Sequence, residues 1–397
     1  MKTRLLSLFD FFKAPKPIPP GVYSYQSPPD APVPQKYFLR VEPNESSTLV
    51  VNASLILHLN PIATEFAYAF LEQIDEANML RNVLKKYRID EETLRRDYTS
   101  FLEKINSVMQ TEDLDPIEFF GFERATEQDL ENLTAPFRLD CALTYRLPKD
   151  TSILYTPVER VKQELSTEEW KSILDKAWQA GIPHILFTGG EPTLRSDLLD
   201  LIVHAEQNGQ VCGLITDGHV FHNISTLDGF LNAGLDYLML LFNPQSPESW
   251  QLIEKIAPRD IFITVHLTLN AENVPYIAEN IARLASIGVN ALSLSAISTE
   301  FVPQLNQASE LAAYHDIKLV WDLPVPYSKF NPVRQEVFDE DHLQGAGKTW
   351  LYVEPDGDVL PGQGIPIVLG NLITHKWEEI WKNCQNYVKN KAHIGVA

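Results

Sequence analysis

Apolar and polar positions follow two patterns along this 397-residue chain. From residue 136 onward, short apolar runs are separated by longer stretches in which apolar residues recur every third or fourth position, which is typical of strands alternating with helices. Strands are predicted at about 137–143, 184–188, 211–216, 236–242, 260–269, 290–296 and 317–322. Repeated βα units with apolar strands predict a parallel sheet, curved or closed as a barrel. The first helix of the series has a capping box, Ser166 with Glu169, and ends at Gly181.

The N-terminal part of the chain has a different pattern. Two β-rich runs flank a turn, and three amphipathic helices follow them, which together predict a small winged-helix-like domain over residues 37–110. These elements are expected at Thr48–Asn52, Ser54–His58, from Asn60–Pro61 onward, at about 79–87 and from Asp90 onward. Asn as N-cap with Pro at the first helical position is a strong helix start.

The remaining segments are expected to connect or extend these two parts. Residues 1–36 predict an amphipathic helix (Leu5, Leu8, Phe9 and Phe12 on one face) and a proline-rich tether. Residues 111–135 are acidic and weakly periodic, as in a linker. The barrel-like series ends near residue 325, and an extension over 326–397 contains a predicted hairpin at 351–360 and a final helix at about 377–390.

Composition and charge exclude several classes of protein. With 44% hydrophobic residues, the chain can bury large cores, and its net charge of -20 disfavours nucleic acid and anionic membranes as partners. There is no apolar run of eighteen residues and no signal-cleavage pattern, so we expect no membrane span and a cytoplasmic protein. The three cysteines, Cys141, Cys212 and Cys384, form neither a disulfide framework nor a zinc motif.

Candidate chemistry is concentrated at the end of the second strand of the series, in Gly189-Gly190-Glu191-Pro192. Glycines there allow a close approach of the backbone to a ligand and leave amides to donate to it, and a carboxylate follows at the carboxyl edge of the sheet. An ordinary strand-to-helix turn explains the same four residues equally well.

Residues 136–322, with this motif in place, resemble the partial (βα)6 barrel of radical S-adenosylmethionine (SAM) enzymes. In that family a Gly-Gly-Glu-Pro motif ends the second strand and holds the amino group of SAM. The resemblance therefore implies that Gly189, Gly190, Glu191 and Pro192 line a SAM site. Leu214–Gly218 and Thr268–Asn273 resemble the ends of the third and fifth strands of the family.

The two ends of the chain extend the resemblance. Residues 344–347, 353–361, 369–372 and 380–381 are similar to the SPASM extension, which carries auxiliary iron-sulfur clusters in peptide-modifying members. The N-terminal unit resembles a PqqD-like domain, which binds leader peptides of ribosomally made, modified peptides. A precursor or leader peptide is thus an expected partner, together with an active maturase.

The chain departs from this family at the cluster ligands. A radical SAM site needs Cys-x3-Cys-x2-Cys for its [4Fe-4S] cluster, and we align the first cysteine with Cys141, so that Tyr145 and Pro148 take the other two places. Gln344 and Gly362 stand at expected SPASM cysteines. We therefore expect a vestigial cluster position at Cys141, no [4Fe-4S] cluster, and no cofactor beyond residual affinity for SAM.

These observations predict a degenerate radical-SAM-like protein that acts as a peptide-binding or accessory factor in peptide maturation. The alternative is an enzyme on the same barrel that uses SAM without radical chemistry, or that binds a metal. His219 and His222 at one strand end and His266 inside the barrel are the residues for a metal, although lone histidines are more often ordinary core or surface residues.

Overall fold

The computed structural model describes residues 17–28, 35–51, 55–110, 133–148, 161–320, 323–324 and 345–394. The chain divides into two compact units, Met1–Thr134 and Ala135–Ala397, and each is described by itself. The predicted amphipathic helix before residue 17 and most of the predicted linker lie outside the described residues.

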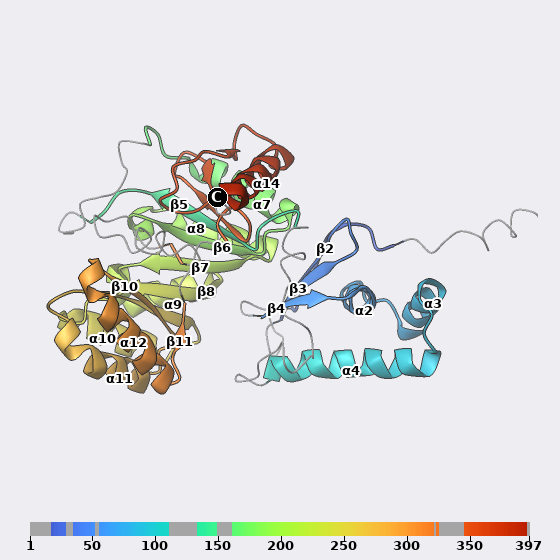
Figure 1. Cartoon of the computed structure of the whole chain (residues 1–397), viewed down its shortest axis with the longest axis horizontal. Coiled ribbons are helices and arrows are strands. Elements are labelled where there is room, and N and C mark those ends of the chain that lie inside the picture. The colour runs from blue at the N-terminus through green and yellow to red at the C-terminus, as the bar shows by residue number, and fades with distance from the viewer. Residues whose placement is uncertain are drawn as a thin grey trace, which may run out of the picture. The chain divides into compact units, whose positions relative to one another are not determined.

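The N-terminal unit is a four-stranded antiparallel sheet covered by helices (Figure 1). Its elements are β1 (Gly21–Gln26), β2 (Lys36–Val41), β3 (Ser47–Val51), β4 (Leu55–Leu59), α2 (Pro61–Leu71), α3 (Glu76–Lys86) and α4 (Glu91–Gln110). The sequence predicted only two of these strands. Strands β1 and β2 are additional. β1 falls in the predicted tether and pairs with β2 along its whole length, so the sheet of this unit begins before residue 37.

Local signals place the helices of this unit as expected. The side chain of Asn60 accepts a hydrogen bond from the backbone amide of Ala63 at 2.8 Å and caps α2. Phe66 of α2 packs between Tyr98 and Phe101 of α4, with ring centroids 5.3 and 5.9 Å apart. The aromatic contacts join the first and last helices over one core.

The second unit contains a ten-stranded sheet with the order β11-β10-β9-β8-β7-β6-β5-β12-β13-β14. Seven of its strands follow one another in chain order, each parallel to the next: β5 (Arg138–Thr144), β6 (His184–Gly189), β7 (Val211–Thr216), β8 (Leu235–Leu241), β9 (Phe262–Leu269), β10 (Ala291–Ala296) and β11 (Lys318–Leu319). The helices between them are α7 (Thr167–Ala180), α8 (Leu198–Asn208), α9 (Ile224–Asn232), α10 (Pro247–Ile256), α11 (Ile277–Ile287) and α12 (Val302–Tyr314). The predicted βα series is confirmed, and so are the capping box at Ser166 and the left-handed Gly181 at the end of α7.

The C-terminal segment joins the same sheet. The predicted hairpin is present as β12 (Trp350–Val353) and β13 (Asp358–Leu360), followed by β14 (Gly370–Asn371) and the final helix α14 (Trp377–Ile394). β12 also pairs in parallel with β5, which the sequence did not predict. The hydroxyl of Tyr145, just after β5, donates to Glu354 at 2.9 Å and fastens the hairpin further. The extension is therefore part of the same compact unit as the barrel-like series.

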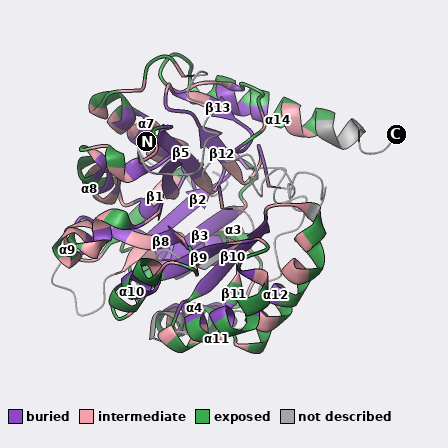
Figure 2. Cartoon of the chain, turned by 90° about the vertical axis from the view of Figure 1, so that its left-hand side faces the viewer, coloured by how far each residue is buried: buried purple, intermediate pink, exposed green. Residues whose placement is uncertain are grey.

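This sheet is open. Among the described strands β11 and β14 are its two edges and do not pair with each other, so the sheet does not close into a barrel. One face of the sheet has an apolar core of Leu186, Ile215 and Met239, and the helices cover the other face. Figure 2 shows the strands buried and the helices exposed on their outer sides. None of the described helices combines the length and apolar character that a bilayer crossing needs.

Candidate functional site

The two glycines of the Gly-Gly-Glu-Pro motif lie against the chain that follows β5. The amide of Gly190 donates to the carbonyl of Thr144 at 2.7 Å, and the amide of Glu191 donates to the carbonyl of Arg146 at 2.8 Å. A Cβ atom on Gly189 would overlap the carbonyl of Thr144, and one on Gly190 would overlap the carbonyl of Arg146. Glycine is thus needed for close backbone contact, as expected, but the contact is with the chain itself, and these two amides are not left to donate to a ligand.

Glu191 connects the ends of β6 and β7. One carboxylate oxygen accepts hydrogen bonds from the Thr216 hydroxyl at 2.8 Å and from the Thr193 amide at 3.0 Å, and the other accepts the Asp217 amide at 2.9 Å. The side chain is 3% exposed. Pro192 then begins a short 3-10 helix, Pro192–Leu194, with Glu191 as its N-cap. The motif therefore fixes three neighbouring strand ends at the carboxyl edge of the sheet.

The ionisation of Glu191 is perturbed by this position. Burial, and secondly the nearby carboxylate of Asp217, raise the pKa of Glu191 to about 7, although the hydrogen bonds from Thr193 and Asp217 favour the ionised form. A buried carboxyl group with such a pKa gains or loses its proton near neutral pH, which is a frequent property of functional sites.

Arg195 stabilises the same edge of the sheet. The sequence pattern did not predict a role for this residue. Its guanidinium donates to the carbonyl of Leu143 at 3.2 Å and to the carbonyl of Leu165 at 3.0 Å, and it pairs with Asp197. Thr216 and Asp217 were missed as partners of Glu191 as well. Their position directly after the next parallel strand is the signal that could have found them, because the ends of parallel strands meet at one edge.

The three cysteines lie on three elements and are all buried. Cys141 is inside β5 and pairs with Phe187, whereas Cys212 on β7 pairs with Ile185, so both point to the face opposite Leu186. The thiol of Cys212 contacts the carbonyl of Ile202 in α8 at 4.0 Å, which identifies this as the helix-covered face. Burial raises the pKa of Cys141 well above its ordinary value. Over the described ranges, no cysteine belongs to a group of three potential metal ligands.

The candidate metal histidines are not brought together. His219 and His222 lie on a short 3-10 helix after β7, with ring centroids 5.8 Å apart. His266 on β9 is buried among hydroxyl groups, 2.9 Å from Ser293 and 3.1 Å from Ser295. Burial lowers the pKa of His266 to about 4, so the ring is neutral at physiological pH. These three side chains form no common ligand group in the part of the chain that the structure describes.

Comparison with known proteins finds similarity over the part of the chain that carries this site. Residues 141–248, which span β5 to the start of α10, match the model of the radical SAM superfamily. Residues 141–248 are a radical SAM domain. A PqqA peptide cyclase of Methylobacterium sp. (strain 4-46) is 26% identical over 290 residues, which cover 63% of this chain and 74% of that protein.

Solved structures agree on the fold around the radical SAM domain. Streptococcus suis SuiB bound to S-adenosylmethionine superposes with a TM-score of 0.54 at 12% identity, over 87% of this chain and 86% of SuiB. SuiB bound to its precursor peptide SuiA gives a TM-score of 0.55 at 13% identity, over 86% of both chains. The predicted α/β fold of radical SAM type is confirmed.

The expected absence of a cofactor is corrected by the same comparison. Proteins with a radical SAM domain use SAM and a [4Fe-4S] cluster, and this chain has three cysteines that can supply thiolates. The expectation that the chain carries no cofactor, and no cluster in particular, is therefore wrong. The positions of Cys141, Cys212 and Cys384 do not form a cluster site by themselves, so we derive no chemical step through the cluster.

The close contact at Gly190 predicts a large effect of one methyl group. Gly190→Ala should lower the stability of residues 135–397 by about 1–3 kcal/mol, because the new Cβ atom must displace the carbonyl of Arg146. All seven tryptophans lie in this part of the chain, so denaturant unfolding followed by tryptophan fluorescence reports on it alone. Gly229→Ala on α9 is the matched control, since no atom lies within 4 Å of its added Cβ. Equal stability of the two variants would contradict the argument.

The raised pKa of Glu191 predicts a pH dependence. The carboxyl group of Glu191 has a pKa of about 7 in the folded protein and about 4.5 in the unfolded chain. Between these two pH values the unfolded chain has lost the proton that the folded protein still holds, so the free energy of unfolding should fall as pH rises, by about 3 kcal/mol at most. In Glu191→Gln this part of the pH dependence should disappear, which unfolding midpoints by tryptophan fluorescence between pH 4.5 and 8 will show. Glu310→Gln, an exposed change on α12, should keep the wild-type slope. An unchanged slope in Glu191→Gln would refute the assignment.

Proposed function

We propose that this chain binds a precursor peptide during the maturation of a ribosomally made peptide. The observation that carries the proposal is the order of parts: a small sheet-and-helix unit precedes a radical SAM domain with a C-terminal extension, and SuiB, which has been solved with its precursor peptide SuiA, superposes over 86% of the chain. The similarity to a PqqA peptide cyclase supports the same class of function. Basic or neutral peptides suit a chain with a net charge of -20.

The N-terminal unit is the proposed site of peptide recognition. Its antiparallel sheet ends in two edge strands, β1 and β4, and extended peptides bind to sheet edges by adding a strand. We further propose that the chain is degenerate in the sense that its contribution rests on peptide binding, with an active maturase as a partner. The structure of SuiB with its bound precursor peptide supports the peptide-binding part of this proposal.

Peptide binding can be tested with short peptides encoded beside the gene for this chain. Full-length protein should bind one of them, and hydrogen exchange should show slower exchange within residues 17–110 when the peptide is present. A scrambled peptide of the same composition is the control. A variant with Cys141→Ala, Cys212→Ala and Cys384→Ala should bind equally well if recognition lies in the N-terminal unit. Protection confined to residues 135–397, or loss of binding in that folded variant, would contradict the proposal.

We also propose that the carboxyl edge formed by Gly189–Pro192 and Asp217 is the SAM side of the radical SAM domain. Calorimetry with SAM should detect binding to the full chain, and Gly190→Ala should weaken it by about tenfold because the edge is displaced. Gly229→Ala should bind as the wild type does. Equal affinity in both variants, or no binding by the wild type, would count against this site.

A further inference from the structure

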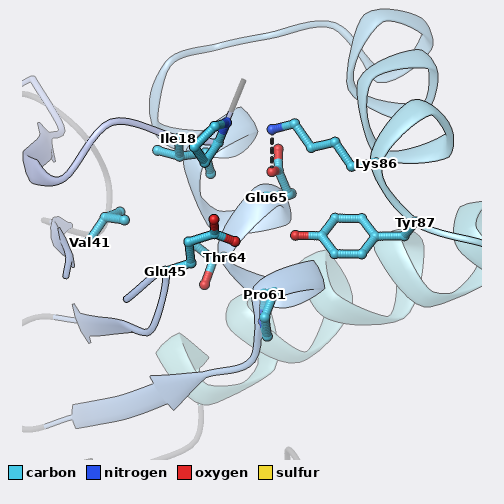
Figure 3. A pocket seen from close by; sticks show the side chains of 9 residues that line it. Ile18, Val41, Glu45, Pro61, Thr64, Glu65, Lys86 and Tyr87 are labelled. Atoms are coloured by element: carbon cyan, nitrogen blue, oxygen red, sulfur yellow. Dashed lines mark hydrogen bonds and ion pairs between the residues drawn. The ribbon is translucent and has the colours of Figure 1, made fainter. Parts of the chain in front are cut away.

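The N-terminal unit contains a cavity of about 260 Å³, formed by parts of the chain that are distant in sequence (Figure 3). Ile18 before β1 forms one wall. Glu45 comes from the turn between β2 and β3, Thr64 and Glu65 from the first turns of α2, and Lys86 and Tyr87 from the end of α3. Pockets for drug-sized ligands have volumes of about 300–1,000 Å³, so this smaller cavity suits a smaller group, such as one side chain.

The charges that line the cavity do not cancel. The ammonium group of Lys86 lies 2.5 Å from a carboxylate oxygen of Glu65, whose side chain is 9% exposed. This partly buried pair is neutral as a whole. Glu45 adds a second carboxylate, and across the described residues no hydrogen bond or ion pair engages its side chain. The cavity therefore carries one net negative charge.

Glu45 is held toward the cavity by an unusual backbone conformation. Its φ is 68°, a left-handed value that residues other than glycine, asparagine and aspartate rarely adopt. Two backbone hydrogen bonds fix this turn, from the Glu42 amide to the carbonyl of Ser46 at 2.8 Å and from the Glu45 amide to the carbonyl of Glu42 at 3.0 Å. Figure 3 shows the carboxylate of Glu45 and the hydroxyl of Tyr87 pointing toward each other across the pocket.

Tyr87 adds a hydroxyl group to the lining of the cavity. Burial raises the pKa of Tyr87, and the negative charges of Glu65 and Glu45 raise it further, so both carboxylates act on this hydroxyl. A ligand in the cavity would meet two carboxylates, the hydroxyl group of Tyr87 and one ammonium group that is already paired, whereas the hydroxyl group of Thr64 is hydrogen-bonded to Asn60 and Ser47. Donor groups with a positive charge fit such a lining, and a carboxylate or phosphate does not.

We propose that this cavity binds an alkylammonium or guanidinium group, supplied by a lysine or arginine side chain of the precursor peptide. The identity of the occupant, a peptide side chain, rests on the proposed function. The preference of the cavity for a cation does not depend on that function. A side chain is favoured over a free amine because the cavity is small, is open to solvent past the exposed Glu45, and lies in the unit proposed for peptide recognition.

The preference of the cavity for cations is tested by titrating the full chain with ethylguanidinium and n-butylammonium. Amide resonances of Glu45, Thr64 and Tyr87 should shift on titration with either cation and should not shift with butyrate or n-butanol. Glu45→Gln should weaken cation binding by about three- to fivefold, as expected for a partly exposed charge pair. Glu92→Gln, the same change at an exposed site on α4, should have no effect. Equal shifts with butyrate, or unchanged binding in Glu45→Gln, would overturn the proposal.

The occupant is tested by competition. The bound precursor peptide should displace ethylguanidinium, and replacing its critical lysine or arginine by norleucine should abolish the displacement. Cation binding without competition would overturn the assignment to a peptide side chain. If Glu45→Gln binds the peptide with the same affinity as the wild type, the inference is overturned and the proposed function stays intact. If the wild type binds no peptide, the proposed function is overturned and the cation titration alone tests the cavity.

Discussion

The structure of the radical SAM domain depends on one backbone contact, between Gly189–Gly190 and the carbonyls of Thr144 and Arg146. Because no Cβ atom intervenes, the chain after β5 lies directly on the end of β6. Glu191 then reaches from this contact to Thr216 and Asp217 at the end of β7. Three strand ends are thereby held together by a connected set of buried hydrogen bonds, which keeps the carboxyl edge in one arrangement.

The elements of the fold were predictable because their signals are local. Asn60 and Ser166 bond to amides three residues further on, and Gly181 ends a helix through its own backbone angle. The parallel strands β5 to β10 were predictable from short apolar runs, since strands buried on both faces contain few polar residues. These signals need no knowledge of which strand lies beside which.

The pairing of distant segments was not predictable in this way. β12 lies beside β5 although more than two hundred residues separate them, and a hairpin pattern at 351–360 gives no sign of a third neighbour. Strand β1 lies in a segment whose prolines suggested only a tether, yet Gly21–Gln26 is free of proline and pairs with β2. The partners of Glu191 and the pair formed by Glu65 and Lys86 likewise depend on contacts across 21 to 26 residues.

The side of the sheet to which a residue points decides where the thiol of Cys141 lies. Side chains alternate along a strand, so a shift of one residue moves a side chain from the interior to the helix-covered face. Leu186 faces the interior, and Cys141 is paired with its neighbour Phe187, which turns the thiol away from the interior. His266, in contrast, is paired with Ser293 and reaches its hydroxyl. A residue type at a suitable spacing therefore becomes a candidate ligand only when strand register puts it on the right face, and register is a property of the assembled sheet.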